Sequence, residues 1–174
     1  MASEKTQDAI ALLKADHRKV EELFEKYESA RSKKADLAKQ ICLELTIHTM
    51  IEEEIFYPAC REAGVESDMM DEANVEHDGA KMLIGELENG GPDDQYYDAK
   101  VKVLSEEIKH HVKEEEQRGG IFTQARDKDL DLDALGEQML ARKEELMAQF
   151  EKNGLPKPVT LTMTAPALEQ GALA

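Results

Sequence analysis

Residues 48–58 read HTMIEEEIFYP, and the first five of these residues decide the fold. His48 and Glu52 are four residues apart, so on a helix they occupy one face, a single turn from each other. Ile41, Leu45 and Ile55 continue the same face at steps of three or four residues. The pattern predicts an amphipathic helix whose buried stripe contains a histidine and a glutamate.

Three other segments carry an apolar stripe of the same period, and each stripe contains one histidine. These histidines are His17, His77 and His111, and His111 is followed four residues later by Glu115. A stripe takes about two positions in seven, so four helices would each place a histidine there by chance in roughly 1% of cases. A buried, ionised glutamate also needs a cation or a proton as partner. The repeated placement therefore indicates one shared site.

Turn chemistry separates the four segments. The breaks lie at residues 30–34, 62–67, 89–94 and 118–120, and Ala, Leu, Glu, Lys and Met are frequent between them. No segment of the sequence shows the sustained alternation that is typical of a strand. Four amphipathic helices with short connections predict an all-α fold, an antiparallel up-down four-helix bundle.

We expect three parts along the chain. Residues 1–126 should form the bundle. Residues 127–153 should add a C-terminal helix packed on or beside the bundle, because apolar residues repeat at helical spacing between Leu132 and Phe150. Residues 154–174 carry three prolines among Thr, Ala and Gly with little apolar periodicity, which predicts a disordered or loosely draped, flexible tail.

The charge balance excludes some classes of partner. The 174 residues include 22 Lys and Arg against 38 Asp and Glu, a formal net charge of −16. An acidic surface repels phosphate backbones and anionic lipid, so we expect neither nucleic acid nor membrane as a partner. The sequence has no apolar run of about 18 residues and no apolar signal core near its start, which predicts a cytoplasmic protein. The sequence does not decide whether the protein is a monomer or a homodimer.

The turn positions predict that the four histidines meet at one level. In an antiparallel hairpin, residues at equal height are symmetric about the turn, and the midpoint between each pair of successive stripe histidines falls in a predicted break. The imidazoles should therefore share one level of the core. Glu52 and Glu115 lie one turn further along two helices that run parallel, so both carboxylates should be on the same side of that level.

Four imidazoles and two carboxylates that converge in a bundle core are typical of a metal site. Such ligands, without thiolate, suit iron, manganese or zinc, and six of them exceed what one tetrahedral zinc ion needs. Two octahedral ions fit better, with both glutamates and an oxo or hydroxo group as bridges. About one position per ion would then be open to a small ligand such as O2, NO or peroxide.

The last helix allows two registers for its ligands. His111 is in phase with Leu104 and Ile108, whereas His110 is rotated by about 100° at 3.6 residues per turn. We therefore predict His111 with Glu115 as the inward pair, and His110 with Glu114 as the alternative.

Tyr57, two acidic runs and Lys81 lie near these residues in the sequence. At ideal helical phase Tyr57 points away from His48, so we expect it to pack between helices or at the surface, unless the helix distorts near Pro58. The acidic runs 52–54 and 114–116 should face solvent except for the member in phase with the stripe. Lys81 is one turn beyond His77 and could reach a bound anion.

The motifs as a set resemble the hemerythrin-like, HHE cation-binding family. The resemblance covers about residues 8–126 and rests on Asp16-His17-Arg18, His48-x3-Glu52-Glu53-Glu54-Ile55-Phe56-Tyr57-Pro58, Glu76-His77 and His110-His111-Val112-Lys113-Glu114-Glu115-Glu116. It implies a four-helix bundle with a non-haem di-iron site. Its implied metal ligands are His17, His48, Glu52, His77, His111 and Glu115.

This chain departs from the oxygen-carrying members of that family in three places. The positions four residues from His77 are Ala73 and Lys81, so the second histidine of the carriers' third helix is absent. The stretch after Glu116 lacks the proline that normally follows. The carriers commonly use an aspartate five residues after the last histidine, where this chain has Glu116. The absence of the second histidine argues against reversible oxygen transport.

The resemblance implies a di-iron protein whose open iron sites bind or react with O2, NO or peroxide, in the response to or sensing of oxidative or nitrosative stress. The alternatives are a di-iron enzyme with catalase-like or NO-reducing activity and an iron donor for iron-sulfur repair. A ferritin-like oxidase would need Glu-x-x-His on two helices, and the sequence has it once, at Glu107 and His110. A metal-free structural bundle is the remaining alternative.

Overall fold

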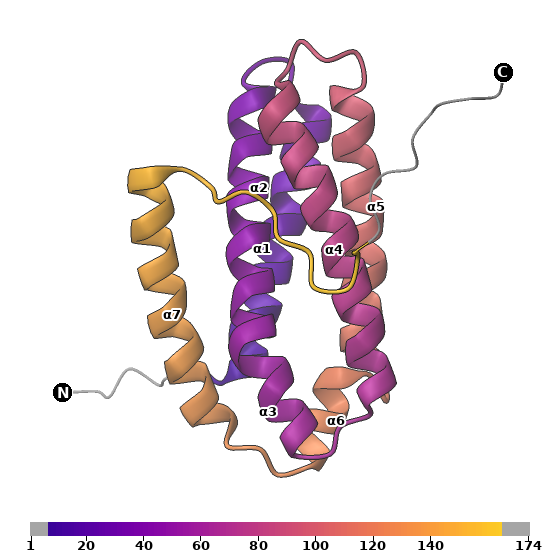
Figure 1. Ribbon diagram of the computed structural model, residues 1–174, viewed down its shortest axis with the longest axis vertical. Helices are drawn as coiled ribbons and strands as arrows, with labels where there is room; N and C mark the ends of the chain where they lie inside the picture. The colour runs from indigo at the N-terminus through magenta and orange to yellow at the C-terminus, as the bar shows by residue number, and fades with distance from the viewer. Residues whose placement is uncertain (1–6, 165–174) are drawn as a thin grey trace, which may run out of the picture.

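A computed structural model describes residues 7–164 of the chain, and within that range it contains helices and no strands. Four long rods stand side by side (Figure 1). They are α1 (Ala9–Ser29), a continuous run of α2 (Lys34–Ile51), η1 (Glu52–Phe56) and α3 (Tyr57–Glu62), then α4 (Ser67–Gly90) and α5 (Tyr97–Glu116). The four-helix bundle that the sequence predicts is confirmed.

Two further helices complete the described chain, α6 (Ile121–Asp127) and α7 (Leu132–Asn153). The short α6 closes one end of the bundle, and its Ile121 and Phe122 are buried in the core. The longer α7 packs on α1 and α2 (Figure 1). The sequence pattern predicts α7 but not α6, whose seven residues are too few to show a helical period.

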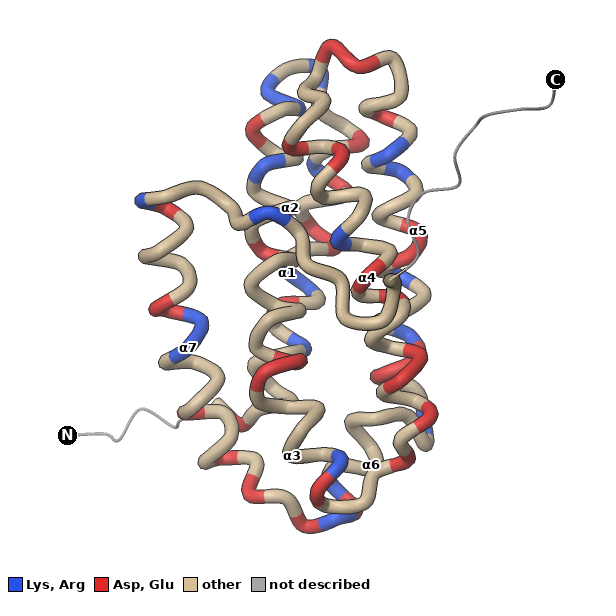
Figure 2. Tube along the Cα trace, in the orientation of Figure 1, with Lys and Arg blue, Asp and Glu red and all other residues tan. Residues whose placement is uncertain are grey.

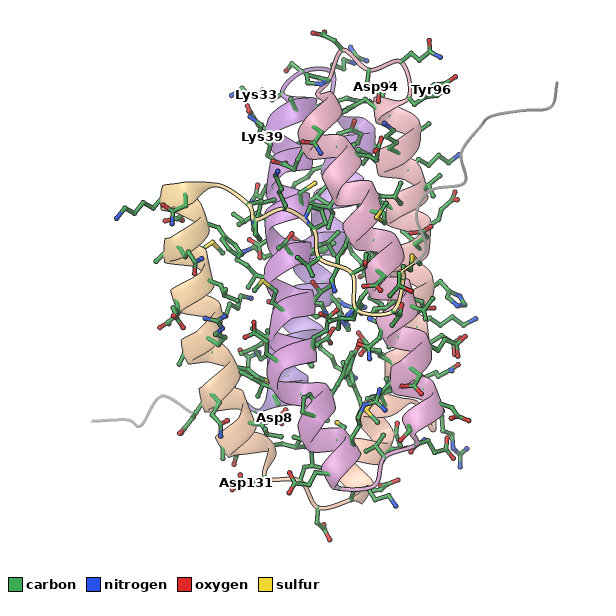
Figure 3. All side chains as sticks on the ribbon, in the orientation of Figure 1. Asp8, Lys33, Lys39, Asp94, Tyr96 and Asp131 are labelled. Atoms are coloured by element: carbon green, nitrogen blue, oxygen red, sulfur yellow. The ribbon has the colours of Figure 1, made fainter. Side chains whose placement is uncertain are left out.

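Aspartate caps begin both α1 and α7. The Asp8 carboxylate accepts a hydrogen bond from Ala11 N at 2.7 Å, and the Asp131 carboxylate accepts one from Ala134 N at 3.0 Å. Each cap satisfies one of the backbone N–H groups that a helix leaves free in its first turn. Figure 3 shows Asp8 and Asp131 at the same end of the molecule, so α1 and α7 start together.

The apolar core consists of two clusters, one towards each end of the bundle. In α1, Leu13 belongs to the first cluster and Val20 to the second, and His17 lies between them. The first cluster includes Ile51, Phe56 and Phe122, and the second includes Leu45, Leu104 and Ile108. A buried polar layer therefore divides the core near its middle.

An extended segment, residues 154–164 and here called the strap, follows α7 and crosses α2 and α4 (Figure 1). The Asp78 carboxylate on α4 accepts backbone hydrogen bonds from Leu161, Thr162 and Met163. The strap has no helix or strand, yet these bonds hold it in place, which a disordered tail would not show. The rest of the predicted tail, residues 165–174, lies outside the described residues.

Charged residues are distributed along all the helices, with acidic positions on every rod (Figure 2). None of the helices within residues 7–164 combines the length and the apolar character that crossing a bilayer requires.

A close backbone contact fixes α7 against the start of α1. A Cβ atom placed on Gly136 would lie 2.9 Å from Ala9 N and would also overlap Gln7 O. We expect Gly136→Ala to lower the free energy of unfolding by about 1–3 kcal/mol, because backbone atoms cannot make room for it. Urea denaturation followed by circular dichroism measures this change.

Gly79→Ala is the matched control. Gly79 is also in a helix, but a Cβ there would meet only the Glu107 carboxylate, at 3.6 Å. Helix propensity alone should raise the stability of this variant by about 0.5–1 kcal/mol. Equal effects of the two substitutions would contradict the close packing of α7 on α1.

Candidate metal centre

The bundle brings four histidines from four helices to one level of the core. His17 of α1 and His48 of α2 face each other with their Nε2 atoms 3.2 Å apart. His77 of α4 and His111 of α5 form a second pair with the same 3.2 Å separation. All four side chains are buried. The level that the turn positions predict is therefore present, and it is divided into two pairs.

Two carboxylates, Glu52 of η1 and Glu115 of α5, lie between the histidine pairs, and neither has any exposed surface. Glu52 Oε2 lies 3.3 Å from Nε2 of His48 and 3.3 Å from Nε2 of His77. Glu115 Oε2 approaches Nε2 of the other histidine of each pair, at 3.3 and 3.6 Å. Each carboxylate thus reaches both pairs, as a ligand bridging two cations would.

The outer nitrogen of each imidazole faces a carboxylate from a different helix. The Nδ1–carboxylate distances are 2.7 Å for His17 and Glu116, 3.5 Å for His48 and Asp16, 3.0 Å for His77 and Glu53, and 2.7 Å for His111 and Glu76. Three of these are hydrogen-bond distances, and the His48–Asp16 contact is longer. Because an ionised carboxylate only accepts, the ring proton of the three bonded histidines belongs on Nδ1.

These tautomers leave lone pairs facing one another inside the core. With the proton on Nδ1, Nε2 of each bonded ring is an acceptor, so His77 and His111 present two acceptors 3.2 Å apart. Glu52 Oε1 and Glu115 Oε2 have no hydrogen-bond partner among the described residues. A buried group of acceptors without donors is costly unless cations lie between them. The donor set therefore fits metal ions.

Two groups of potential ligand atoms share Glu52. His17, His48, Glu52 and Glu115 form one group, and Glu52, His77 and His111 form the other, with all atoms of a group within 4.8 Å of one another. Ligand sets of histidine nitrogen and carboxylate oxygen without thiolate are more typical of iron or manganese sites than of closed structural zinc sites. The arrangement is suited to two neighbouring cations with a common carboxylate.

The two buried carboxylates lie close enough for the charge of one to change the pKa of the other. Burial and the charge of Glu115 raise the pKa of Glu52 to about 8. Although burial opposes it, the nearby His111 and His17 side chains hold the pKa of Glu115 below its usual range. The two buried carboxylates therefore differ in how readily they ionise, because each lies in the field of the other.

Tyr57 lies at the site, as the sequence allows if the helix distorts near Pro58. Its side chain is 2% exposed, and its hydroxyl donates a hydrogen bond to Glu115 Oε1 at 2.8 Å. The Tyr57 hydroxyl oxygen also lies 3.4 Å from Glu52 Oε2, and the Tyr57 ring stacks on the His77 ring. Burial and the two carboxylates raise the pKa of Tyr57 well above its usual value, so the phenol stays protonated.

The distortion that brings Tyr57 to the site is a π-helical turn. In η1 the Tyr57 N–H bonds the carbonyl of Glu52, five residues back, so the turn contains one residue more than an α-helical turn. The extra residue rotates Tyr57 towards the core. Pro58 has no N–H to bond the carbonyl four residues before it, and this weakens the α-helical pattern at that point. The proline was the available signal.

Two acidic residues expected at the solvated face also belong to the site. Glu53 contacts His77, and Glu116 contacts His17. In the sequence, Glu53 comes five residues after His48, and Glu116 comes five residues after His111. Burial opposes the charge on Glu53, but hydrogen bonds from His77 and Lys81 outweigh it and lower its pKa. Lys81 is thus paired with Glu53, at 2.7 Å.

The burial of the two adjacent histidines of α5 shows which of them points into the core. His111 is buried with Glu115, whereas the side chain of His110 is 59% exposed and lies 3.3 Å from Glu76 Oε1. All six residues that the sequence proposes as ligands therefore meet in the core, and the alternative His110 does not join them.

Comparison with known proteins gives one family and one related structure. The model of the Hemerythrin HHE cation binding domain matches residues 8–118. A crystal structure of a hemerythrin HHE cation binding domain-containing protein from Mycobacterium kansasii is similar, with a TM-score of 0.65 and 21% sequence identity, covering 85% of this chain and 94% of that one. At this identity the likeness concerns the fold alone. A comparison with curated proteins gives no match.

The carboxylates that hold the imidazoles should matter for metal affinity. We expect Glu53→Gln to weaken metal binding about 10–100-fold, because it removes the anionic partner of His77 Nδ1. Competition with a chelator measures the affinity. Glu54→Gln is the matched control, since Glu54 pairs with Arg142 at 2.7 Å and is not among the carboxylates that face the histidines. Equal losses in both variants would contradict the role of Glu53.

The register predicts opposite results for the two adjacent histidines. His111→Ala should reduce the metal bound per chain to about one ion or less, because one histidine pair loses a ligand. His110→Ala should leave the metal content unchanged. Elemental analysis of metal-loaded variants decides between them, and loss of metal in the His110 variant alone would reverse the assignment.

Proposed function

The chain belongs to the hemerythrin HHE cation-binding domain family, and from this membership we propose that it is a non-haem di-iron protein whose site binds or reacts with O2, NO or peroxide. The proposed ligands are His17, His48, Glu52, His77, His111 and Glu115. The observation that carries the proposal is the pair of fully buried carboxylates that each approach both histidine pairs.

The surrounding residues hold the ligands in a fixed orientation. Glu116, Glu53 and Glu76 each accept a hydrogen bond from a histidine Nδ1, which directs Nε2 to the centre. Outer cations hold these carboxylates in turn. Arg18 donates to Glu116 at 2.6 Å, and Lys81 donates to Glu53. Such a shell makes the site rigid before a metal binds.

The space beside the histidines limits the size of what can bind. A cavity of about 10 Å³ lies between the four imidazoles and the apolar side chains Val20, Leu45, Ile108 and Val112. This is room for about one water-sized group. Two iron ions would supply redox chemistry and open coordination positions, and the cavity restricts their ligands to small molecules. This supports O2, NO or peroxide, and stress response or sensing as the setting.

Tyr57 favours peroxide chemistry as a second candidate function. Its protonated phenol donates to Glu115 at 2.8 Å and lies 3.5 Å from His77 Nε2, so it holds a proton beside the proposed metal ligands. A general acid in this position can protonate a departing oxygen. Iron donation receives no such support, because all six proposed ligands are buried.

Optical titration of the iron-loaded, reduced protein with O2, NO and peroxide tests the main proposal. We expect about two irons per chain, a near-ultraviolet band of the diferric form that disappears on reduction, and a new spectrum with at least one of the three ligands. Fewer than about one iron per chain, unaffected by His48→Ala, would contradict the di-iron site.

Oxygen evolution from added peroxide tests the second candidate. Tyr57→Phe should lower the turnover rate about 100-fold or more while leaving the iron content unchanged, because the phenol supplies a proton and is not proposed as a ligand. A wild-type rate no better than that of free ferric iron would exclude catalase-like activity. An unchanged rate in the Phe variant would remove the role of Tyr57.

A further inference from the structure

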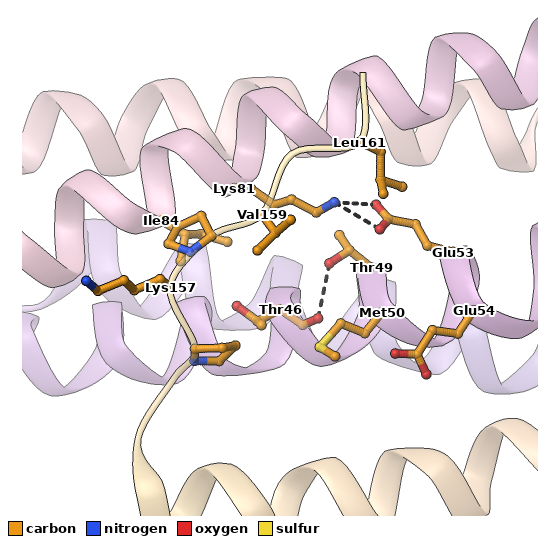
Figure 4. Close-up of a pocket in the computed structure, with 12 residues that line it drawn as sticks. Thr46, Thr49, Met50, Glu53, Glu54, Lys81, Ile84, Lys157, Val159 and Leu161 are labelled. Atoms are coloured by element: carbon orange, nitrogen blue, oxygen red, sulfur yellow. Dashed lines mark hydrogen bonds and ion pairs between the residues drawn. The ribbon is translucent and has the colours of Figure 1, made fainter. Parts of the chain in front are cut away.

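A second, larger cavity lies outside the bundle, under the strap and between α2 and α4 (Figure 4). Its volume is about 380 Å³. Most of the side chains that line it are apolar or weakly polar, and those used below are Thr49, Met50, Ile84, Pro158, Val159 and Leu161. The cavity is partly open to solvent, and its volume is sufficient for a small apolar guest.

The strap that roofs this cavity is anchored at two points. Asp78 has no exposed surface and accepts hydrogen bonds from Leu161 N at 3.0 Å, Thr162 N at 2.6 Å and Thr162 Oγ1 at 2.7 Å. Pro158 lies against Gly85 so closely that a Cβ on that glycine would be 2.8 Å from Pro158 Cγ. The roof is therefore a built part of the fold.

Thr49 connects this cavity with the proposed metal centre. Its side chain lines the strap cavity, and it also lines the small cavity between the four histidines. It is 2% exposed, and its hydroxyl donates to the carbonyl of Thr46 at 3.1 Å, as Figure 4 shows. Thr49 is thus a residue that borders both spaces.

The charges at the rim of the cavity select against ions. Lys81 is paired with Glu53 at 2.7 Å and lies 3.4 Å from Asp78, while Glu54 is paired with Arg142. Lys157 extends away from the cavity in Figure 4. An anion would have to compete with these ion pairs, whereas an uncharged, weakly polar molecule would not.

We propose that the strap cavity is an access chamber in which an uncharged diatomic gas collects before it passes Thr49 to the metal centre. This inference rests on the proposed function, because it names the route by which O2 or NO reaches that site. The apolar lining concentrates the gas, and the Thr49 side chain controls its passage inward.

Xenon tests the chamber, because it is an uncharged probe that fills apolar cavities and does not need the metals. Crystals of the full-length protein under xenon pressure should show an anomalous peak near Met50, Ile84 and Val159. Gly85→Ala should displace Pro158 and reduce the xenon occupancy, and the double variant with Pro158→Ala should restore it. No xenon in the wild-type cavity, or equal occupancy in all three proteins, would overturn the chamber.

Stopped-flow association of NO with the reduced, iron-loaded protein tests the route. The rate constant should follow the size of the side chain at position 49, with Thr49→Ala faster, Thr49→Val unchanged within about twofold and Thr49→Leu slower by about tenfold or more. The association and dissociation rate constants for NO should both change in the same direction, because a gate alters passage inward and outward alike. Thr49→Val matches the wild type in volume and controls for the lost hydroxyl.

The two proposals fail in different ways. Normal NO binding with rates that ignore the size of residue 49 would overturn the route and leave the metal-site function intact. If wild-type protein holds xenon but its iron binds or reacts with none of NO, O2 and peroxide, the proposed function and the route are both wrong, and only the gas cavity stands. If Thr49→Leu does not fold, an unchanged rate in Thr49→Ala is sufficient to reject the route.

Discussion

Hydrogen-bond acceptors are concentrated at the centre of the bundle, where water cannot reach them. Glu52 and Glu115 are without exposed surface, and their oxygens lie 3.3–3.6 Å from four imidazole nitrogens. An unpaired buried carboxylate costs several kcal/mol, and a pair of them in contact with lone pairs costs more. Cations between the two histidine pairs would remove that cost, and the raised pKa of Glu52 is its signature in the metal-free chain.

The outer parts of the fold are organised around this centre. Each imidazole faces a carboxylate, and two of these carboxylates, Glu116 and Glu53, are in turn paired with Arg18 and Lys81. The long helix α7 also contributes a charged residue to this arrangement. Lys143 of α7 pairs with Asp16, which faces His48, so α7 supports the site as well as covering α1 and α2. The strap adds a roof over the side of the bundle where Thr49 borders both the inner and the outer cavity.

Helical phase was enough to predict the bundle and the six residues that meet at its centre, because a buried stripe and short turns determine which side chains share a level. The same reasoning failed where the helix is irregular. Tyr57 reaches Glu115 only because η1 contains an extra residue per turn, and ideal phase placed it elsewhere. Glu53 and Glu116 were expected to face solvent since an offset of five residues leaves the stripe, yet they contact histidines of neighbouring helices. The strap depends on Asp78, a long-range anchor without periodicity.

We propose that the core binds two neighbouring cations with Glu52 and Glu115 between them. Anomalous diffraction at the iron absorption edge, from crystals of the iron-loaded protein, would locate these cations. We expect two iron peaks, one beside the His17–His48 pair and the other beside the His77–His111 pair, with both glutamates in contact with them. A single peak, or iron bound only at surface carboxylates, would contradict it.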